Sequence, residues 1–149
     1  MTEVMFYHLE RGCLEDVLPG LLEKTLERGW RAVVRASSRD RVEALDAHLW
    51  TYRDESFLPH GAAGDGAAQP VWLTDKDDAP NQANVLFLTD HAKASADTIG
   101  GFARCVTIFD GRDDEALAGA RSFWKETTAA GHDVAYWKQS PEGRWEKQN

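Results

Sequence analysis

The sequence has few cysteines and few basic residues, and both shortages exclude whole classes of protein. Cys13 and Cys105 are its only cysteines, far apart and in no spacing typical of a metal or redox site, so we expect two reduced thiols. The 17 Lys and Arg are outnumbered by 25 Asp and Glu, which gives a net charge of -8. A general phosphate-neutralising surface needs clustered Lys and Arg, so direct binding of DNA or RNA is a weak alternative here.

Long hydrophobic runs are also missing. No apolar stretch approaches the roughly 20 residues of a membrane span. The opening residues, MTEVMFYHLERG, lack the basic region and apolar core of a signal peptide. The sequence therefore predicts a cytoplasmic protein. With 149 residues, 42% of them hydrophobic and 28% charged, the chain is most simply one globular domain covering residues 1–149.

The motifs of nucleotide, metal and catalytic sites are missing as well. The turn at residues 10–13 contains neither GxGxxG nor GxxxxGK[ST], and the five histidines form no HxH or HxxxH pair. Asp54 and Glu55 are adjacent, which rarely aims two carboxylates at one atom, and Ser56 has no obvious base. We predict no catalytic residue, no metal and no cofactor. A small α/β nucleotide-binding enzyme remains the alternative function.

What the sequence does contain is an alternation of strand-like and helical patterns. Strands are expected at residues 4–9, 31–36, 71–74, 84–89, 103–109 and 133–137. Helices are expected from Leu14 to a stop at Gly29, after a cap at Ser37 or Ser38, as a short turn at 97–102, and at 111–130. This alternation predicts an α/β three-layer sandwich with a mainly parallel sheet, Rossmann-like but without a dinucleotide fingerprint. Residues 138–149 are expected to form a polar C-terminal tail, and the strand order is not readable.

Residues 45–61, LDAHLWTYRDESFLPHG, form the most unusual stretch of the chain. Large side chains follow one another there without a helical or strand period, among them Trp50, Phe57, Leu58 and Pro59. Such a loop either folds back onto its own domain or meets another surface. We interpret His60 as a residue that orders the loop by a hydrogen bond rather than as a catalytic group.

The last expected helix has two distinct faces. One face is mostly small, which suits close packing on a sheet, and consists of Ala116, Gly119, Ala120, Phe123, Thr127 and Ala130. Gly119 lowers helix propensity by roughly 1 kcal/mol relative to Ala. We interpret it as a place where a neighbouring segment approaches closely.

The second face of this helix carries Leu117, Arg121, Trp124 and Lys125. Two interpretations of it remain open. It is either a solvated flank with Trp124 folded down at its margin, or a small pocket. In the pocket, Leu117 and Trp124 supply apolar walls while Arg121 and Lys125 hold a carboxylate, an arrangement that suits a peptide with an acidic, hydrophobic C-terminal end.

Taken together, these segments resemble the chi subunit of bacterial DNA polymerase III. The resemblance extends over nearly the whole chain, and its most specific part is the LW…ESFLPH segment. It rests on Phe6-Tyr7, LDAHLW at 45–50, ESFLPH at 55–60, Ala120-Arg121, Trp124-Lys125 and Gly131.

This resemblance implies a non-catalytic accessory subunit of the clamp-loader assembly, within the DNA-directed DNA polymerase complex that replicates DNA. Such a subunit binds the psi subunit and the acidic, Phe-terminated C-terminal tail of the single-stranded-DNA-binding protein, and so contacts DNA only indirectly. A psi subunit is not universal, and the sequence does not say whether the host has one. Without it, the surface formed by Trp50 and Phe57 would contact another clamp-loader subunit or serve the core.

Individual residues take roles from the same resemblance. Trp50 and Phe57 match the psi-facing surface, to which we also assign Leu58 and Pro59. Arg121, Trp124 and Lys125 match the tail-binding helix, where the arginine is the main carboxylate partner and Trp124 stands where a tyrosine is common. Leu117 completes this predicted tail site.

Overall fold

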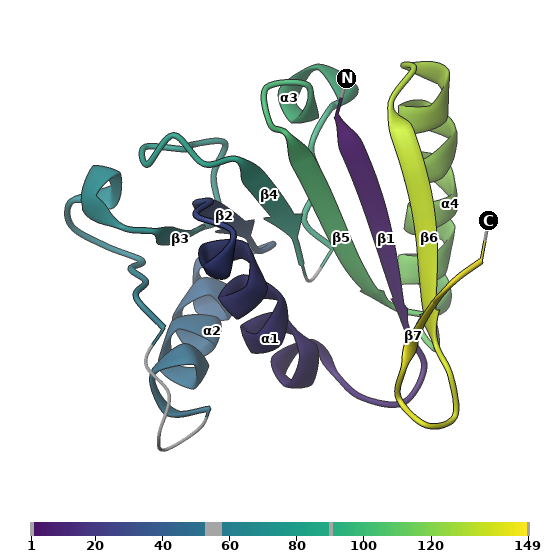
Figure 1. The fold of residues 1–149 in the computed structure, drawn as a ribbon, viewed down its shortest axis with the longest axis horizontal. Helices are drawn as coiled ribbons and strands as arrows, with labels where there is room; N and C mark the ends of the chain where they lie inside the picture. The colour runs from purple at the N-terminus through teal and green to yellow at the C-terminus, as the bar shows by residue number, and fades with distance from the viewer. Residues whose placement is uncertain (1, 53–57, 90, 149) are drawn as a thin grey trace.

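The computed structural model of the chain describes residues 2–52, 58–89 and 91–148. A seven-stranded sheet runs through the molecule in the order β3-β2-β4-β5-β1-β6-β7 (Figure 1). Its strands are β1 (Glu3–Leu9), β2 (Ala32–Arg35), β3 (Val71–Thr74), β4 (Val85–Leu88), β5 (Arg104–Asp110), β6 (Asp133–Gln139) and β7 (Trp145–Lys147). All neighbouring pairs are parallel except β6 and β7.

Helices cover both faces of the sheet. α1 (Leu14–Glu27) and α2 (Arg39–Thr51) lie on one face, and α4 (Asp114–Ala129) lies on the other with the short α3 (Ala96–Ile99) (Figure 1). A single 3-10 turn, η1 (Gly66–Ala68), precedes β3. The predicted three-layer α/β/α sandwich with a mainly parallel sheet is confirmed. No helix among the described residues is long and apolar enough to cross a membrane.

Strand β1 supplies both cores, because successive side chains of a strand point to opposite faces. Tyr7 and Leu9 belong to the core beneath α1 and α2, together with Leu18 and Leu22 of α1. Val4 and Phe6 belong to the core beneath α4. The sequence VMFYHL therefore reads as a continuous apolar run, as expected of a strand buried on both sides.

The ends of the helices follow local sequence signals. The Ser38 hydroxyl accepts a hydrogen bond from the backbone N–H of Arg41 (3.2 Å) and so caps α2, which resolves the predicted choice between Ser37 and Ser38. Asp113 caps α4 in the same way, through the N–H groups of Glu115 and Ala116. Gly29 stops α1 with φ +78°, a left-handed conformation that glycine adopts without strain.

The segment 138–149, expected to be a polar tail, is partly strand. β6 continues to Gln139, and β7 returns antiparallel to it after a turn in which Gly143 has φ +83°. The Trp145 ring packs edge-on against Tyr7 at 4.8 Å. Three residues are too few to show the alternation of a strand, so β7 could be recognised only from its pairing with β6 in the structure.

The interpretation of Gly119 is also wrong. The residue is exposed on α4, and a Cβ built on it would meet nothing within 4 Å. The two cysteines are free, as expected, with Cys13 exposed and Cys105 buried. Burial raises the pKa of the Cys105 thiol to about 12, which keeps it protonated and unreactive at neutral pH.

Candidate functional site

The residues assigned to tail binding lie on the second face of α4. The aromatic residue among them, Trp124, packs against the sheet. The Trp124 ring lies 5.3 Å from the ring of Phe6, and the neighbouring Phe123 lies 5.7 Å from it. Phe6 is fully buried, while Trp124 is half-buried with its edge at the surface. Packing on β1 therefore fixes Trp124 in place, so that an apolar wall is already formed before any partner arrives.

Strand β6 extends this wall. Tyr136 is in register with Phe6, and its ring lies 5.9 Å from Trp124 in a T-shaped arrangement. The Tyr136 hydroxyl lies 2.5 Å from Nδ1 of His8, the next residue of β1 on the same face. Trp124, Tyr136 and His8 thus form a continuous row of rings along one side of α4.

Two cations lie next to this row. Arg121 and Lys125 are both exposed, one helical turn apart, and within the part of the chain that the structure describes neither has a salt bridge or a side-chain hydrogen bond. Burial raises the pKa of Tyr136, and the positive charge of Arg121 opposes that shift. An unpaired arginine beside aromatic rings is a suitable receptor for a carboxylate with an apolar side chain.

The structure combines the two interpretations of this face. Trp124 and Leu117 pack against the core, as expected of a solvated flank. Arg121 and Lys125 pair with none of the described residues, as expected of a pocket that awaits a carboxylate. A groove of about 550 Å³ lies elsewhere, along the opposite flank of α4 beside Gly119 and the loop at 91–94. None of the residues assigned to tail binding lines this groove.

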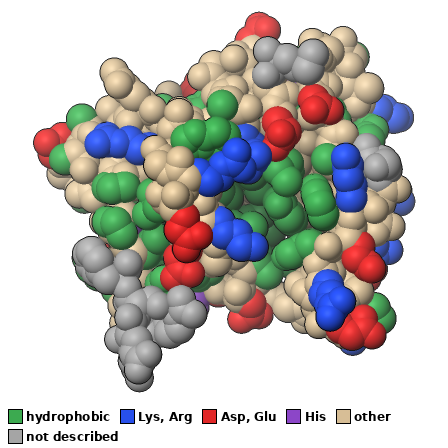
Figure 2. Space-filling model, in the orientation of Figure 1, with side chains coloured by type: hydrophobic (Ala, Val, Ile, Leu, Met, Phe, Trp, Pro, Cys, Tyr) green, Lys and Arg blue, Asp and Glu red, His purple; other side chains and the backbone are tan. Residues whose placement is uncertain are grey.

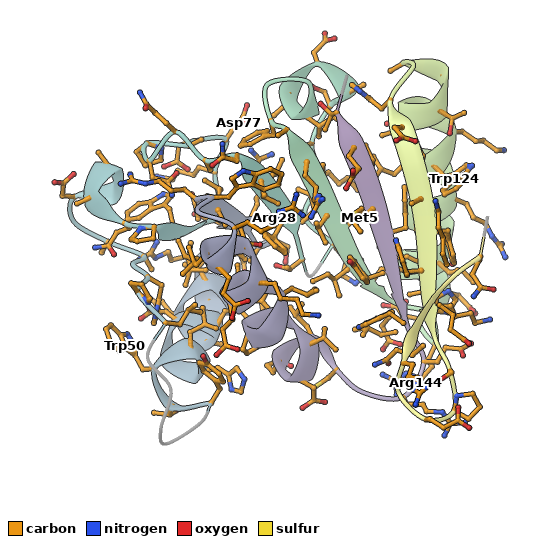
Figure 3. All side chains as sticks on the ribbon, in the orientation of Figure 1. Met5, Arg28, Trp50, Asp77, Trp124 and Arg144 are labelled. Carbon is orange, nitrogen blue, oxygen red and sulfur yellow. The ribbon has the colours of Figure 1, made fainter. Side chains whose placement is uncertain are left out.

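A second surface lies at the C-terminal end of α2, across the molecule from Trp124 (Figure 3). Trp50 is 53% exposed, the only large hydrophobic side chain of the described residues that is so open to solvent. Its ring packs on His60 at 4.5 Å. An exposed tryptophan held in place by a buried neighbour is typical of a protein–protein contact.

His60 is a structural residue, as interpreted from the sequence. Its Nδ1 lies 2.7 Å from the backbone oxygen of Leu58, and its Nε2 lies 3.2 Å from both the backbone oxygen and a carboxylate oxygen of Asp46. The imidazole is buried, and its contacts join residues 58–60 to α2.

One of the residues assigned to the partner surface has to be corrected. Leu58 is 2% exposed and belongs to the core beneath α1 and α2, because the chain turns inward before Gly61 pairs with β3. It supports the surface without being part of it. Pro59 is half-buried, and Phe57 lies outside the described residues.

The sequence reasoning missed His8 and Tyr136 as neighbours of the residues predicted to bind the tail. A signal was present, because alternation places Phe6 and His8 on one face of β1, and Val134 and Tyr136 on one face of β6. What the sequence did not contain was the pairing of β1 with β6, which brings the two sets together.

Comparison with known proteins shows the family of the chain. The sequence matches the family described as "DNA polymerase III chi subunit, HolC" over residues 1–135. The chain belongs to this family. It is therefore a subunit of the DNA polymerase III complex that replicates DNA, and its partners include other chains of that complex.

Two curated relatives carry the same name. The "Probable DNA polymerase III subunit chi" of Rickettsia prowazekii is 29% identical over 156 residues, covering 99% of this chain and 92% of the relative. The "DNA polymerase III subunit chi" of Pseudomonas aeruginosa is 32% identical over 76 residues, covering 49% of this chain and 54% of the relative.

Proposed function

We propose that the protein is a non-catalytic, two-ended adaptor of the polymerase III clamp-loader assembly. One end, at α4, holds the acidic C-terminal tail of the single-stranded-DNA-binding protein. The other end, at Trp50, holds the psi subunit or another clamp-loader chain. The observation that carries the proposal is the pair of unpaired cations, Arg121 and Lys125, beside the fixed ring of Trp124.

The chemistry of the tail indicates which of its groups each of these residues would bind. A terminal phenylalanine presents a carboxylate to Arg121 and a ring to the wall formed by Trp124 and Tyr136. The preceding acidic residues come near Lys125. The chain has a net charge of -8, so the protein as a whole repels an acidic tail, and the local positive charge of Arg121 and Lys125 attracts it. The adaptor would thereby link the replicase to coated single strands without contacting DNA.

Calorimetric titration with a short peptide ending in Asp-Ile-Pro-Phe tests the α4 end. We expect micromolar binding, about 8 kcal/mol of binding free energy, which weakens as salt is added. Arg121→Ala should reduce the binding free energy by roughly 1–3 kcal/mol, because the carboxylate loses a charge-assisted partner. A peptide with a C-terminal amide should bind the unaltered protein as poorly as the acid binds Arg121→Ala.

The matched control is Arg144→Ala, which removes the same charge from an exposed position in the turn between β6 and β7 (Figure 3). It should leave the affinity unchanged. If Arg121→Ala and Arg144→Ala bind the peptide equally well, the tail site is not on α4.

Trp50→Ala tests the other end. The side chain is 53% exposed, so its removal should lower the melting temperature little, yet it should abolish co-purification of clamp-loader subunits with the tagged protein. Leu58→Ala provides the contrast, because it removes a buried side chain and should destabilise the fold by about 2–5 kcal/mol. Retention of all partners by a folded Trp50→Ala variant would contradict the assignment.

A further inference from the structure

The face of the sheet opposite α4 is only partly covered. α1 and α2 lie over the half of the sheet that contains β2, β3 and β4, and no helix of the described residues lies over β6, β7 and most of β1 on that side (Figure 1). Side chains of these strands that point to this face are in register across the sheet. They are Met5 with Ala135, Tyr7 with Trp137, and Trp145 reaching over from β7.

These side chains form a hydrophobic hollow, which we name the open face: Met5, Tyr7, Ala135, Trp137 and Trp145. In Figure 2 hydrophobic side chains fill the floor of the hollow, and charged side chains stand around its rim. Met5 lies in the middle of it on β1 (Figure 3). Met5, Trp137 and Trp145 are each only partly buried, although each packs against the core. Methionine and tryptophan are enriched at the centres of protein–protein interfaces.

Helix α1 forms one wall of the open face. Val17, Leu21, Lys24 and Arg28 fall on one stripe at helical spacing. The opposite side of α1 is already occupied by α2, through the Glu15–Arg41 ion pair and the hydrogen bond from Tyr52 to Glu23. Val17 and Leu21 are partly buried against the core, whereas Lys24 and Arg28 are exposed.

Lys24 and Arg28 make one end of the open face positively charged. Lys24 has no ion pair within the described part of the chain, and the Arg28 guanidinium lies 4.3 Å from the centre of the Trp30 ring. Arg104 approaches the same ring at 5.3 Å while it pairs with Glu3 at 2.7 Å. The chain has a net charge of -8, so a cluster of cations next to a hydrophobic surface is unusual in it.

We propose that the open face is a third docking surface, which binds an amphipathic, acidic segment of another subunit of the polymerase complex. Apolar side chains of that segment would cover Met5 and Trp137, and its carboxylates would meet Lys24 and Arg28. Charge complementarity favours this occupant over a second copy of the chain, because two copies with a charge of -8 repel each other. The surface goes beyond the two-ended adaptor, since it lies on the other side of the sheet from Trp124 and uses neither Arg121 nor Trp50.

Oxidation of Met5 by hydrogen peroxide tests the proposal, because Met5 is one of only two methionines and lies at the centre of the open face. Its oxidation rate is measured by tandem mass spectrometry of the N-terminal peptide, in the isolated full chain and in the polymerase III complex purified from the source cells. If the partner segment covers Met5 in nine-tenths of the chains, Met5 should be oxidised about tenfold more slowly in the complex than in the isolated chain. The double variant Lys24→Glu/Arg28→Glu should restore the rate of the isolated chain.

The matched control is Lys76→Glu, a charge reversal at an exposed position after β3, the edge strand farthest from β6 and β7, which should leave Met5 protected. The double variant should still bind the tail peptide, so its result is independent of the α4 end. Equal oxidation rates in the isolated chain and in the complex would overturn the proposal. So would protection of the isolated chain at high protein concentration, which would assign the face to a second copy, or protection by added single-stranded DNA.

Discussion

Phe6→Ala should lower the free energy of unfolding by about 3–5 kcal/mol, the range for an aromatic side chain deleted from a tightly packed core. Phe6 is fully buried on β1, with its ring centroid between 5.3 and 6.2 Å from those of Phe123, Trp124 and Tyr136. The variant therefore loses three ring contacts and leaves a cavity between the sheet and α4. Urea unfolding followed by circular dichroism measures the change.

The same substitution should affect function through Trp124. With Phe6 gone, the Trp124 ring loses its support from β1, and the tail peptide should bind more weakly even at temperatures where the variant is folded. Phe6→Leu is the control, because it keeps most of the volume and should lose less stability and less affinity. A Phe6→Ala protein that is as stable as the parent would show that α4 does not pack on β1 in this way.

Gly111→Ala is the second substitution with a large expected effect, about 2–3 kcal/mol of destabilisation. A Cβ at Gly111 would lie 1.8 Å from Nε2 of His8, closer than any non-bonded contact. The imidazole has little freedom to move away, since it is 9% exposed, lies 2.5 Å from the Tyr136 hydroxyl and packs on Phe109 at 5.1 Å. Thermal and urea denaturation measure the loss.

Two comparisons make this prediction specific. Gly119→Ala also changes glycine to alanine, but nothing lies within 4 Å of the new Cβ, so it should stabilise α4 by about 0.5–1 kcal/mol. In a His8→Ala background the cost of Gly111→Ala should largely disappear, because the clashing ring is gone, and a double-mutant cycle measures that coupling. An undiminished cost in that background would mean that the backbone at Gly111, and not His8, is the obstacle.

Phe6→Ala and Gly111→Ala both act through side chains of β1, those of Phe6 and His8. Phe6 and His8 point toward α4, where they build the wall beside Arg121, while Met5 and Tyr7 point to the open face. β1 is therefore the element shared by the proposed tail site and the proposed third docking surface. Because the strand is paired on both sides, with β5 and β6, both surfaces rest on a rigid part of the sheet.

Local sequence determined the elements and their ends. The alternation of apolar strands with amphipathic helices, a cap at Ser37 or Ser38 and the glycine stops at Gly29 and Gly131 depend only on nearby residues, so periodicity and capping chemistry predicted them. The start of α4 was expected at Gly111, and the structure moves it to the cap at Asp113. The family resemblance likewise came from residues that are contiguous in sequence, and it is confirmed. The exposed cations on α4 followed from helical spacing alone.

Only the tertiary structure decided which of these features meet. The pairing of β1 with β6 brings Tyr136 and His8 to Trp124, and the return of β7 sets Trp145 on Tyr7 across more than 130 residues of chain. Burial also decided between equivalent apolar residues, leaving Trp50 at the surface and Leu58 in the core. Strand pairing depends on contacts between segments that are distant in sequence, and burial depends on how tightly those segments pack together. A local sequence pattern contains neither kind of information.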